Sequence, residues 1–217
     1  MGTQHSGTSE KELIMEKPAS EKIYLMMNKP CGYVCSAVSD SHKTVYQLLT
    51  QEMQNQVQGA KRGHRLHTIG RLDCNTSGLL LFTTDGQFSH EISTSSTTEI
   101  SKTYLASLSI SVTEDQQQNY ISKAARGLTL PAEKKFGEQK SKPAVLHFIN
   151  QNTCEITVSE GKFHEVRRIF RALGNEVSEL KRIAIGDLTL PQDLLPGQWR
   201  PLTEAEKESL YCHQQDC

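Results

Sequence analysis

The sequence lacks three features that would place it in a familiar class. None of its six cysteines forms a Cys-x-x-Cys pair, and no group of histidines and cysteines has the spacing of a zinc site. No apolar run is long enough to span a bilayer. A zinc ribbon, a disulfide-stapled secreted module and a transmembrane protein are therefore not indicated. We expect a cytoplasmic protein with reduced cysteines that acts away from membranes.

An excess of charge of one sign is also missing. The 217 residues carry 24 Lys and Arg against 25 Asp and Glu, which gives a net charge of −1. No global positive field therefore points to nucleic acid, although a balanced total can hide a local basic patch. The stretch Lys61–His67 is one candidate, because it holds three basic residues and two histidines without an acid.

Short strands dominate the pattern of the chain. Residues 1–22 are polar and charged, and we expect a disordered tail or tag remnant there. Apolar runs and alternation predict strands at 23–27, 33–36, 78–84, 102–110, 144–149, 153–159 and 180–190. Helices are predicted at 113–127 and 163–175, with short ones after Thr44, Asp85 and Thr203. The polar segment 51–64 is expected to be a loop. Because strands often follow one another directly, the pattern favours an α+β fold with a mixed, largely antiparallel sheet and flanking helices.

One carboxylate stands out in the stretch His67–Gly86, which reads HTIGRLDCNTSGLLLFTTDG. Asp73 comes just before the polar turn 75–78 and the apolar run 79–82, and Arg71 stands two residues before it. A lone aspartate at such a place is usually a turn residue or a helix cap. A guanidinium close by would hold the carboxylate ionised, which makes Asp73 a candidate nucleophile or base.

The helix predicted at 163–175 has the clearest pattern in the chain. Its apolar stripe consists of Val166, Ile169, Phe170 and Leu173. Arg167 falls at the edge of this stripe, where a half-buried arginine lines a cleft and needs an anion, either Asp73 or an RNA phosphate. Arg171 lies slightly further round. Arg168 falls opposite the stripe, on the face that we expect to be solvated.

A lysine and a tyrosine share one face of the strand predicted at 102–110. Lys102 and Tyr104 are two residues apart, so their side chains point the same way. Core packing with a bonded hydroxyl is the ordinary explanation for Tyr104. A lysine beside an aromatic ring also suits stacking on a base with a phosphate nearby. His64, His67 and His164 lie near basic residues, and none is given a catalytic role.

Four segments, in order, resemble the motifs of the RsuA-type pseudouridine synthases, the branch of that family that modifies ribosomal RNA. NKPCGYVCS resembles the first motif, GRLDCNTSGLLLFTTDG the aspartate signature, KTYLAS the second motif and EGKFHEVRRIFRALGNEV the third. The resemblance runs from about Ile23 to Tyr211. It implies the pseudouridine synthase fold, with two subdomains around a central catalytic cleft in residues 23–212 and a tail at 213–217. KPAVL and PGQWRPLTEAE look most similar to the small-subunit member, which acts on 16S rRNA.

The resemblance implies roles for individual residues. Asp73 matches the catalytic aspartate, and Tyr104 matches the tyrosine that packs against the uracil and is implicated in proton removal. Arg167 matches the basic residue that pairs with the catalytic carboxylate, and Arg71 the arginine that helps displace the uridine from its stack. Further contacts with RNA are expected from Lys29, Lys102, Arg168 and Arg171.

The expected function is isomerisation of a specific uridine in ribosomal RNA, of the 16S type, by a monomer without cofactor or metal. The expected partner is ribosomal RNA or an assembly intermediate of a ribosomal subunit. Family members often carry an N-terminal S4-type RNA-binding domain, and the residues before Ile23 are too few to form one. One alternative is a non-catalytic RNA-binding or ribosome-assembly factor on the same fold. Another is a carboxylate-dependent hydrolase, which usually needs a second positioned acid or a metal.

Overall fold

The computed structural model describes residues 22–58, 65–94 and 100–210. The expected tails at 1–22 and 213–217 lie outside these ranges apart from residue 22, as do the basic residues Lys61 and Arg62. The strands are β1 Tyr24–Lys29, β2 Tyr33–Val34, β3 Lys43–Thr44, β4 His67–Ile69, β5 Thr76–Thr83, β6 Lys102–Leu108, β7 Thr129–Leu130, β8 Gln139–Lys140, β9 Val145–Phe148, β10 Thr153–Val158, β11 Val177–Ile185, β12 Leu188–Thr189 and β13 Trp199–Pro201. The helices are η1 Val45–Leu48, α1 Gln51–Gln58, α2 Gly86–Thr94, α3 Glu114–Ala124, α4 Glu165–Ala172 and α5 Glu204–Ser209.

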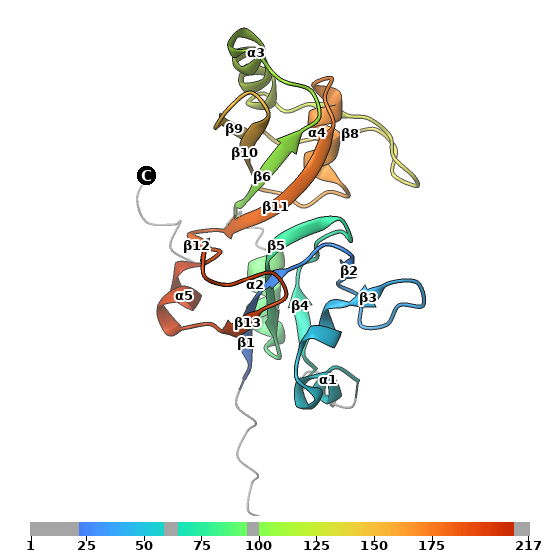
Figure 1. The fold of residues 1–217 in the computed structure, drawn as a ribbon, viewed down its shortest axis with the longest axis vertical. Helices are drawn as coiled ribbons and strands as arrows, with labels where there is room; N and C mark the ends of the chain where they lie inside the picture. Colours follow the sequence, from blue (N-terminus) through green and yellow to red (C-terminus); the bar gives the residue numbers. More distant parts are fainter. Residues whose placement is uncertain (1–21, 59–64, 95–99, 211–217) are drawn as a thin grey trace, which may run out of the picture.

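A mixed sheet runs through the whole molecule (Figure 1). Its strand order is β13–β1–β5–β11–β6–β10–β9, with β4 beside β5 and β12 beside β11. Neighbouring strands of this sheet pair antiparallel, except that β11 and β5 are parallel. The predicted α+β class with a mixed, largely antiparallel sheet is confirmed.

The sheet carries two lobes that meet along β11, beside its neighbours β5 and β6 (Figure 1). One lobe holds β6, β9, β10, α3 and α4, and its core includes Cys154, Ile156 and Phe170. In the other lobe, alternate residues of β1 and β5 enter two different apolar clusters, one on each face of the sheet. Burial on both faces explains why the segment Leu79–Phe82 is continuously apolar.

Several local predictions are confirmed by the hydrogen bonds at helix ends. Thr113 and Gln116 form the expected capping box of α3, and Thr203 and Glu206 form that of α5. Asp85 Oδ1 accepts from the backbone N–H groups at the start of α2. Thr44 precedes a short 3₁₀ helix, η1, but its side chain makes no capping hydrogen bond.

The expected loop at 51–64 is wrong over its first part, because residues 51–58 form helix α1. Val57 is buried in the apolar cluster that contains Leu80 and Phe82 of β5, and Met53, one turn earlier, packs against the same cluster. Two apolar residues four positions apart are enough to dock a short helix, although the polar residues around them hide the pattern. In the described part of the chain, no helix is long and apolar enough to cross a bilayer.

Candidate active site

A cleft of about 620 Å³ opens between the two lobes. Segments far apart in the sequence line it, namely 69–73 with Thr76, residues of β6 and β11, and 158–167 between β10 and α4. Five residues with a predicted role line the cleft, namely Arg71, Asp73, Lys102, Tyr104 and Arg167. The fold therefore brings together the predicted catalytic residues and two of the predicted RNA contacts.

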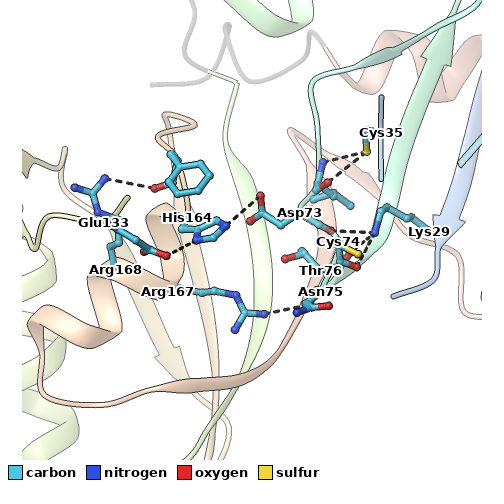
Figure 2. A network of polar contacts seen from close by, with 12 residues as sticks. Lys29, Cys35, Asp73, Cys74, Asn75, Thr76, Glu133, His164, Arg167 and Arg168 are labelled. Atoms are coloured by element: carbon cyan, nitrogen blue, oxygen red, sulfur yellow. Dashed lines mark hydrogen bonds and ion pairs between the residues drawn. The ribbon is translucent and has the colours of Figure 1, made fainter. Parts of the chain in front are cut away.

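Asp73 stands on the turn between β4 and β5, and Lys29 holds the backbone of this turn (Figure 2). Lys29 is fully buried, and its Nζ donates to the carbonyl oxygens of Asp73 at 3.0 Å and Thr76 at 2.8 Å. It also donates to the carbonyls of Cys74 and Pro30. Burial lowers the pKa of Lys29 from its usual value. The prediction that Lys29 contacts RNA is wrong, because its ammonium group is used to hold the turn.

The carboxylate of Asp73 is partly open to the cleft, since its side chain is 42% exposed. Its Oδ1 lies 3.7 Å from Nε2 of His164. On the other side of the ring, Nδ1–H donates to Glu133 Oε1 at 2.8 Å. Figure 2 shows His164 between the two carboxylates. The hydrogen bond and charge of His164 and the charge of Arg171 outweigh burial and hold the pKa of Glu133 below its usual value.

His164 was given no role from the sequence, so the structure adds it to the site. Its backbone is in the left-handed region, with φ of 49°, directly before α4. Its ring stacks on that of Phe163, with centroids 3.8 Å apart. A strained backbone in a cleft is typical of functional positions. The only sequence signal was its position next to a basic helix, because Glu133 is 31 residues away.

Arg167 lies beside Asp73 on the cleft but does not pair with it. Its guanidinium donates to the carbonyl oxygens of Val177 at 2.6 Å and Asn75 at 3.0 Å. Among the described residues there is no ion pair between Arg167 and Asp73, so the expected pairing is not what the structure shows. Arg167 instead ties α4 to the turn that carries Asp73, as Figure 2 shows for Asn75.

The prediction that Arg168 lies on a solvated face is wrong. Arg168 is fully buried, and its guanidinium donates to the carbonyls of Pro131, Gly137 and Phe163 and to the side chain of Gln139. The hairpin formed by residues 129–140, with strands β7 and β8, covers this side of α4. Arg168 therefore fixes the hairpin on the helix and is not available to RNA.

The remaining predicted basic residues differ in their surroundings. Arg71 is exposed on the cleft, and Lys102 lines it from β6. Arg171 is partly exposed and forms ion pairs with Glu133 at 3.3 Å and Glu176 at 3.4 Å. Two neighbouring acids reduce the attraction of Arg171 for a phosphate. In the described ranges, no group of three or more His, Cys, Asp or Glu side chains could hold a metal ion.

Two acids also line the cleft, at the junction of β10 and α4. Glu165 is buried, and burial together with a hydrogen bond to Glu160 raises the pKa of Glu165 to about 8. The same contact and Lys162 hold the pKa of Glu160 below its usual value, against the effect of burial. The pair thus binds a proton in a place where two ionised carboxylates would repel each other.

The chain with this mixed sheet and this partly exposed aspartate, on a turn that Lys29 holds, is similar to known proteins. Residues 23–172 match the family model described as RNA pseudouridylate synthase. Over 187 residues the chain is 43% identical to "Ribosomal small subunit pseudouridine synthase A" of Escherichia coli strain K12. The aligned residues make up 86% of this chain and 73% of that protein. The protein of that name from Haemophilus influenzae is 41% identical over the same length.

Solved structures agree with this assignment. A crystal structure of a pseudouridylate synthase matches with a TM-score of 0.75 and 42% identity, over 88% of this chain and 74% of that chain. The archaeal box H/ACA sRNP Nop10–Cbf5 complex shares the fold alone, with a TM-score of 0.51 and 18% identity. The fold and the site thus define an RNA-modifying isomerase. The chain belongs to the RNA pseudouridylate synthase family and is an RNA pseudouridine synthase.

Proposed function

We propose that this enzyme isomerises one uridine of small-subunit (16S) ribosomal RNA to pseudouridine, with Asp73 as its catalytic carboxylate. The observation that carries the proposal is the partly exposed Asp73 side chain, presented to the cleft by a turn whose backbone Lys29 holds. The relatives named ribosomal small subunit pseudouridine synthase A support the choice of RNA.

The reaction needs one nucleophilic carboxylate in a cleft from which water can be excluded. The N1–C1′ bond of the uridine breaks, the uracil turns, and C5 becomes joined to C1′. Asp73 serves this step either by direct attack on C1′ or through a glycal intermediate. The uridine must first leave its base stack, since C1′ of a stacked nucleotide is out of reach of the turn.

Each neighbour of Asp73 then has a separate task. Tyr104 packs against the uracil and assists proton removal from C5. Arg71, exposed on the cleft, helps to displace the uridine. Arg167 keeps the turn in place through the carbonyl of Asn75, and its charge adds to the field around the carboxylate. Lys102 and, more weakly, Arg171 attract RNA phosphates.

We place the enzyme in the cytoplasm as a monomer, acting on ribosomal RNA or on an assembly intermediate of the small subunit. A non-catalytic assembly factor on the same fold would bind such a particle but leave its uridines unchanged. The partly exposed Asp73 and the placement of Tyr104 and Arg167 on one cleft favour the enzyme.

Mapping of modified uridines tests this proposal. Ribosomal RNA from a deletion strain would be treated with a carbodiimide and read by primer extension. We expect one pseudouridine of 16S rRNA to be missing, and to return with the wild-type gene but not with Asp73→Asn. Loss of a site in 23S rRNA would contradict the proposed substrate. Binding of the protein to small-subunit particles without any change in their pseudouridines would favour the assembly factor.

A further inference from the structure

Arg182 on β11 is a buried cation that forms no ion pair with any other described residue. Its residue is 2% exposed, and its Nε donates to the carbonyl oxygen of Leu79 at 2.8 Å. Its Nη2 is buried and has no hydrogen-bond partner, and in the described ranges no carboxylate forms an ion pair with it. A buried guanidinium in this state is costly unless an anion reaches it at some stage.

Arg182 belongs to the same cleft as the predicted catalytic residues. Arg182 lines the cleft, and its Cα is paired with that of Tyr104 on the neighbouring strand β6. Side chains of paired residues on adjacent strands stand about 5 Å apart at Cβ and share a face of the sheet. On the other side, Arg182 is paired with Gly78 of β5, whose missing side chain lets the two backbones meet closely. Strand β11, which carries Arg182, thus lies between the strand of Tyr104 and the strand that follows Asp73.

A second unpartnered group lies in the same cleft. Thr76 is buried, and its Oγ1 has no hydrogen-bond partner. Of the three buried side-chain atoms without a partner in the described residues, those of Thr76 and Arg182 belong to cleft residues, and that of Gln56 does not. Buried polar groups normally have hydrogen-bond partners, so two exceptions in one cleft indicate that a substrate supplies the missing partners.

The proposed reaction creates such a partner for a short time. When the N1–C1′ bond breaks, its electron pair stays with the uracil and spreads over N1, O2 and O4. Either the Asp73 carboxylate bonds to C1′, or C2′ loses a proton and a C1′–C2′ double bond forms. C5 then bonds to C1′ as the Asp73–C1′ bond breaks or, on the glycal route, as C2′ regains a proton. The C5 proton leaves to a base, and N1 gains a proton. The detached uracil is therefore an anion whose two carbonyl oxygens accept hydrogen bonds.

We propose that Arg182 is a further catalytic residue, which donates hydrogen bonds to a carbonyl oxygen of the detached uracil anion. This inference rests on the proposed function. Thr76 Oγ1 supplies a second donor to the same base. No proton is transferred, because a guanidinium stays charged throughout. Donors that are fixed before the charge develops stabilise it without reorganisation. A guanidinium also presents donors only, so it favours the O4 of uracil over the amino group of cytosine.

Substitution of Arg182 by Met and by Lys tests this assignment, with Arg200→Met as the matched control. Arg200 lies on β13 outside the cleft lining and forms an ion pair with Glu206 at 2.6 Å. Single-turnover rates on a 16S rRNA fragment, RNA affinity and thermal stability would be measured for each variant. Removal of one donor to a developing anion typically lowers the rate by about 10²–10³-fold. We expect that loss for Arg182→Met, unchanged RNA affinity, and partial recovery in Arg182→Lys.

Stability separates this role from a structural one. Because Met removes an uncompensated buried charge, Arg182→Met should be at least as stable as the wild type, while Arg200→Met keeps its rate. An Arg182→Met enzyme that turns over normally, unfolds, or loses affinity as much as rate would overturn the assignment. Wild-type protein without turnover would contradict the proposed function instead, and the stability comparison would still test the buried charge of Arg182.

Discussion

At the scale of single residues, His164 makes a polar contact with the carboxylate of Asp73. His164 is held by Glu133 on one side and by the ring of Phe163 on the other. Its Nε2 is therefore fixed 3.7 Å from Asp73 Oδ1 without further loss of side-chain freedom. This distance is longer than a hydrogen bond, so the ring adds a polar group beside the carboxylate without fixing its orientation.

His164→Gln should lower turnover more than RNA binding. A polar contact at a partly exposed site is worth about 1 kcal/mol or less, so we expect about a fivefold slower reaction. Single-turnover kinetics and a fluorescence titration with an rRNA fragment would give the two quantities. His67→Gln is the control, because His67 lies on β4 and its ring contacts the backbone carbonyl of Arg65 and not Asp73. Equal rates for the two variants would show that His164 does not act on Asp73.

At the scale of elements, helix α4 is covered on both sides. Its apolar stripe, which the sequence predicts, packs on the sheet, with Ile169 and Phe170 fully buried. The 129–140 hairpin covers the opposite side, where Arg168 binds three carbonyl oxygens. The hairpin also supplies Glu133 to His164, so its docking is part of the site.

Arg168→Met should destabilise the protein strongly. Several buried carbonyl oxygens would lose their donor, which costs on the order of 3 kcal/mol. Urea denaturation would measure the loss. Arg171→Met, three residues later, removes only partly exposed ion pairs and should cost less than about 1 kcal/mol. Similar losses in the two variants would contradict the structural role of Arg168.

Glu165, at the first turn of α4, predicts a pH dependence of stability. Because folding raises its pKa from 4.5 to about 8, the folded state holds a proton that the unfolded state has released. This contribution to stability is complete below pH 4.5 and is lost as the pH rises through about 8. The lowered pKa of Glu160 acts in the opposite direction over the acidic part of the range.

Glu165→Gln should therefore gain stability relative to the wild type as the pH rises from about 5 to about 9. Urea denaturation at several pH values would measure the difference. Glu155→Gln, on β10 and more exposed, is the control. A difference between Glu165→Gln and the wild type that stays constant with pH would mean that Glu165 titrates as it does in the unfolded chain.

At the scale of the whole molecule, the neutral total charge hides a basic border of the cleft. Arg71 and Lys102 line the cleft, and Lys134 and Lys135 are exposed on the hairpin beside it. A plot of log affinity against log salt concentration has a slope of about −0.7 to −0.9 per neutralised phosphate, so four contacts give a slope of about −2.8 to −3.6. Titration of a fluorescent rRNA fragment at several salt concentrations would measure this slope.

The hairpin lysines can be tested separately. The double variant Lys134→Ala and Lys135→Ala should make the slope shallower by about 1.4 to 1.8. Lys123→Ala, exposed on α3 and outside the cleft lining, should leave it unchanged. A wild-type isotherm that hardly depends on salt would contradict the basic border and favour recognition by shape or base contacts.

Local patterns predict the sheet, the caps and the position of Asp73, because these depend on neighbours in the sequence. The sequence misplaces Lys29 and Arg168 because most of the oxygen atoms that they bind come from segments 29 to 47 residues away. Helical periodicity fixes an angle on one helix, but it does not show that a hairpin covers the far side. Arg182 did leave a signal, since it shares strand parity with buried Leu180.

Release of tritium from C5-labelled uridine in 16S rRNA tests the central role of Asp73 most directly. Wild-type enzyme should release one tritium per target uridine. Asp73→Asn should release none above background, while its thermal stability and RNA affinity match those of the wild type, because Asp73 is partly exposed and its carbonyl still binds Lys29. Substantial release by a folded Asp73→Asn enzyme would contradict the assignment of Asp73 as the catalytic carboxylate.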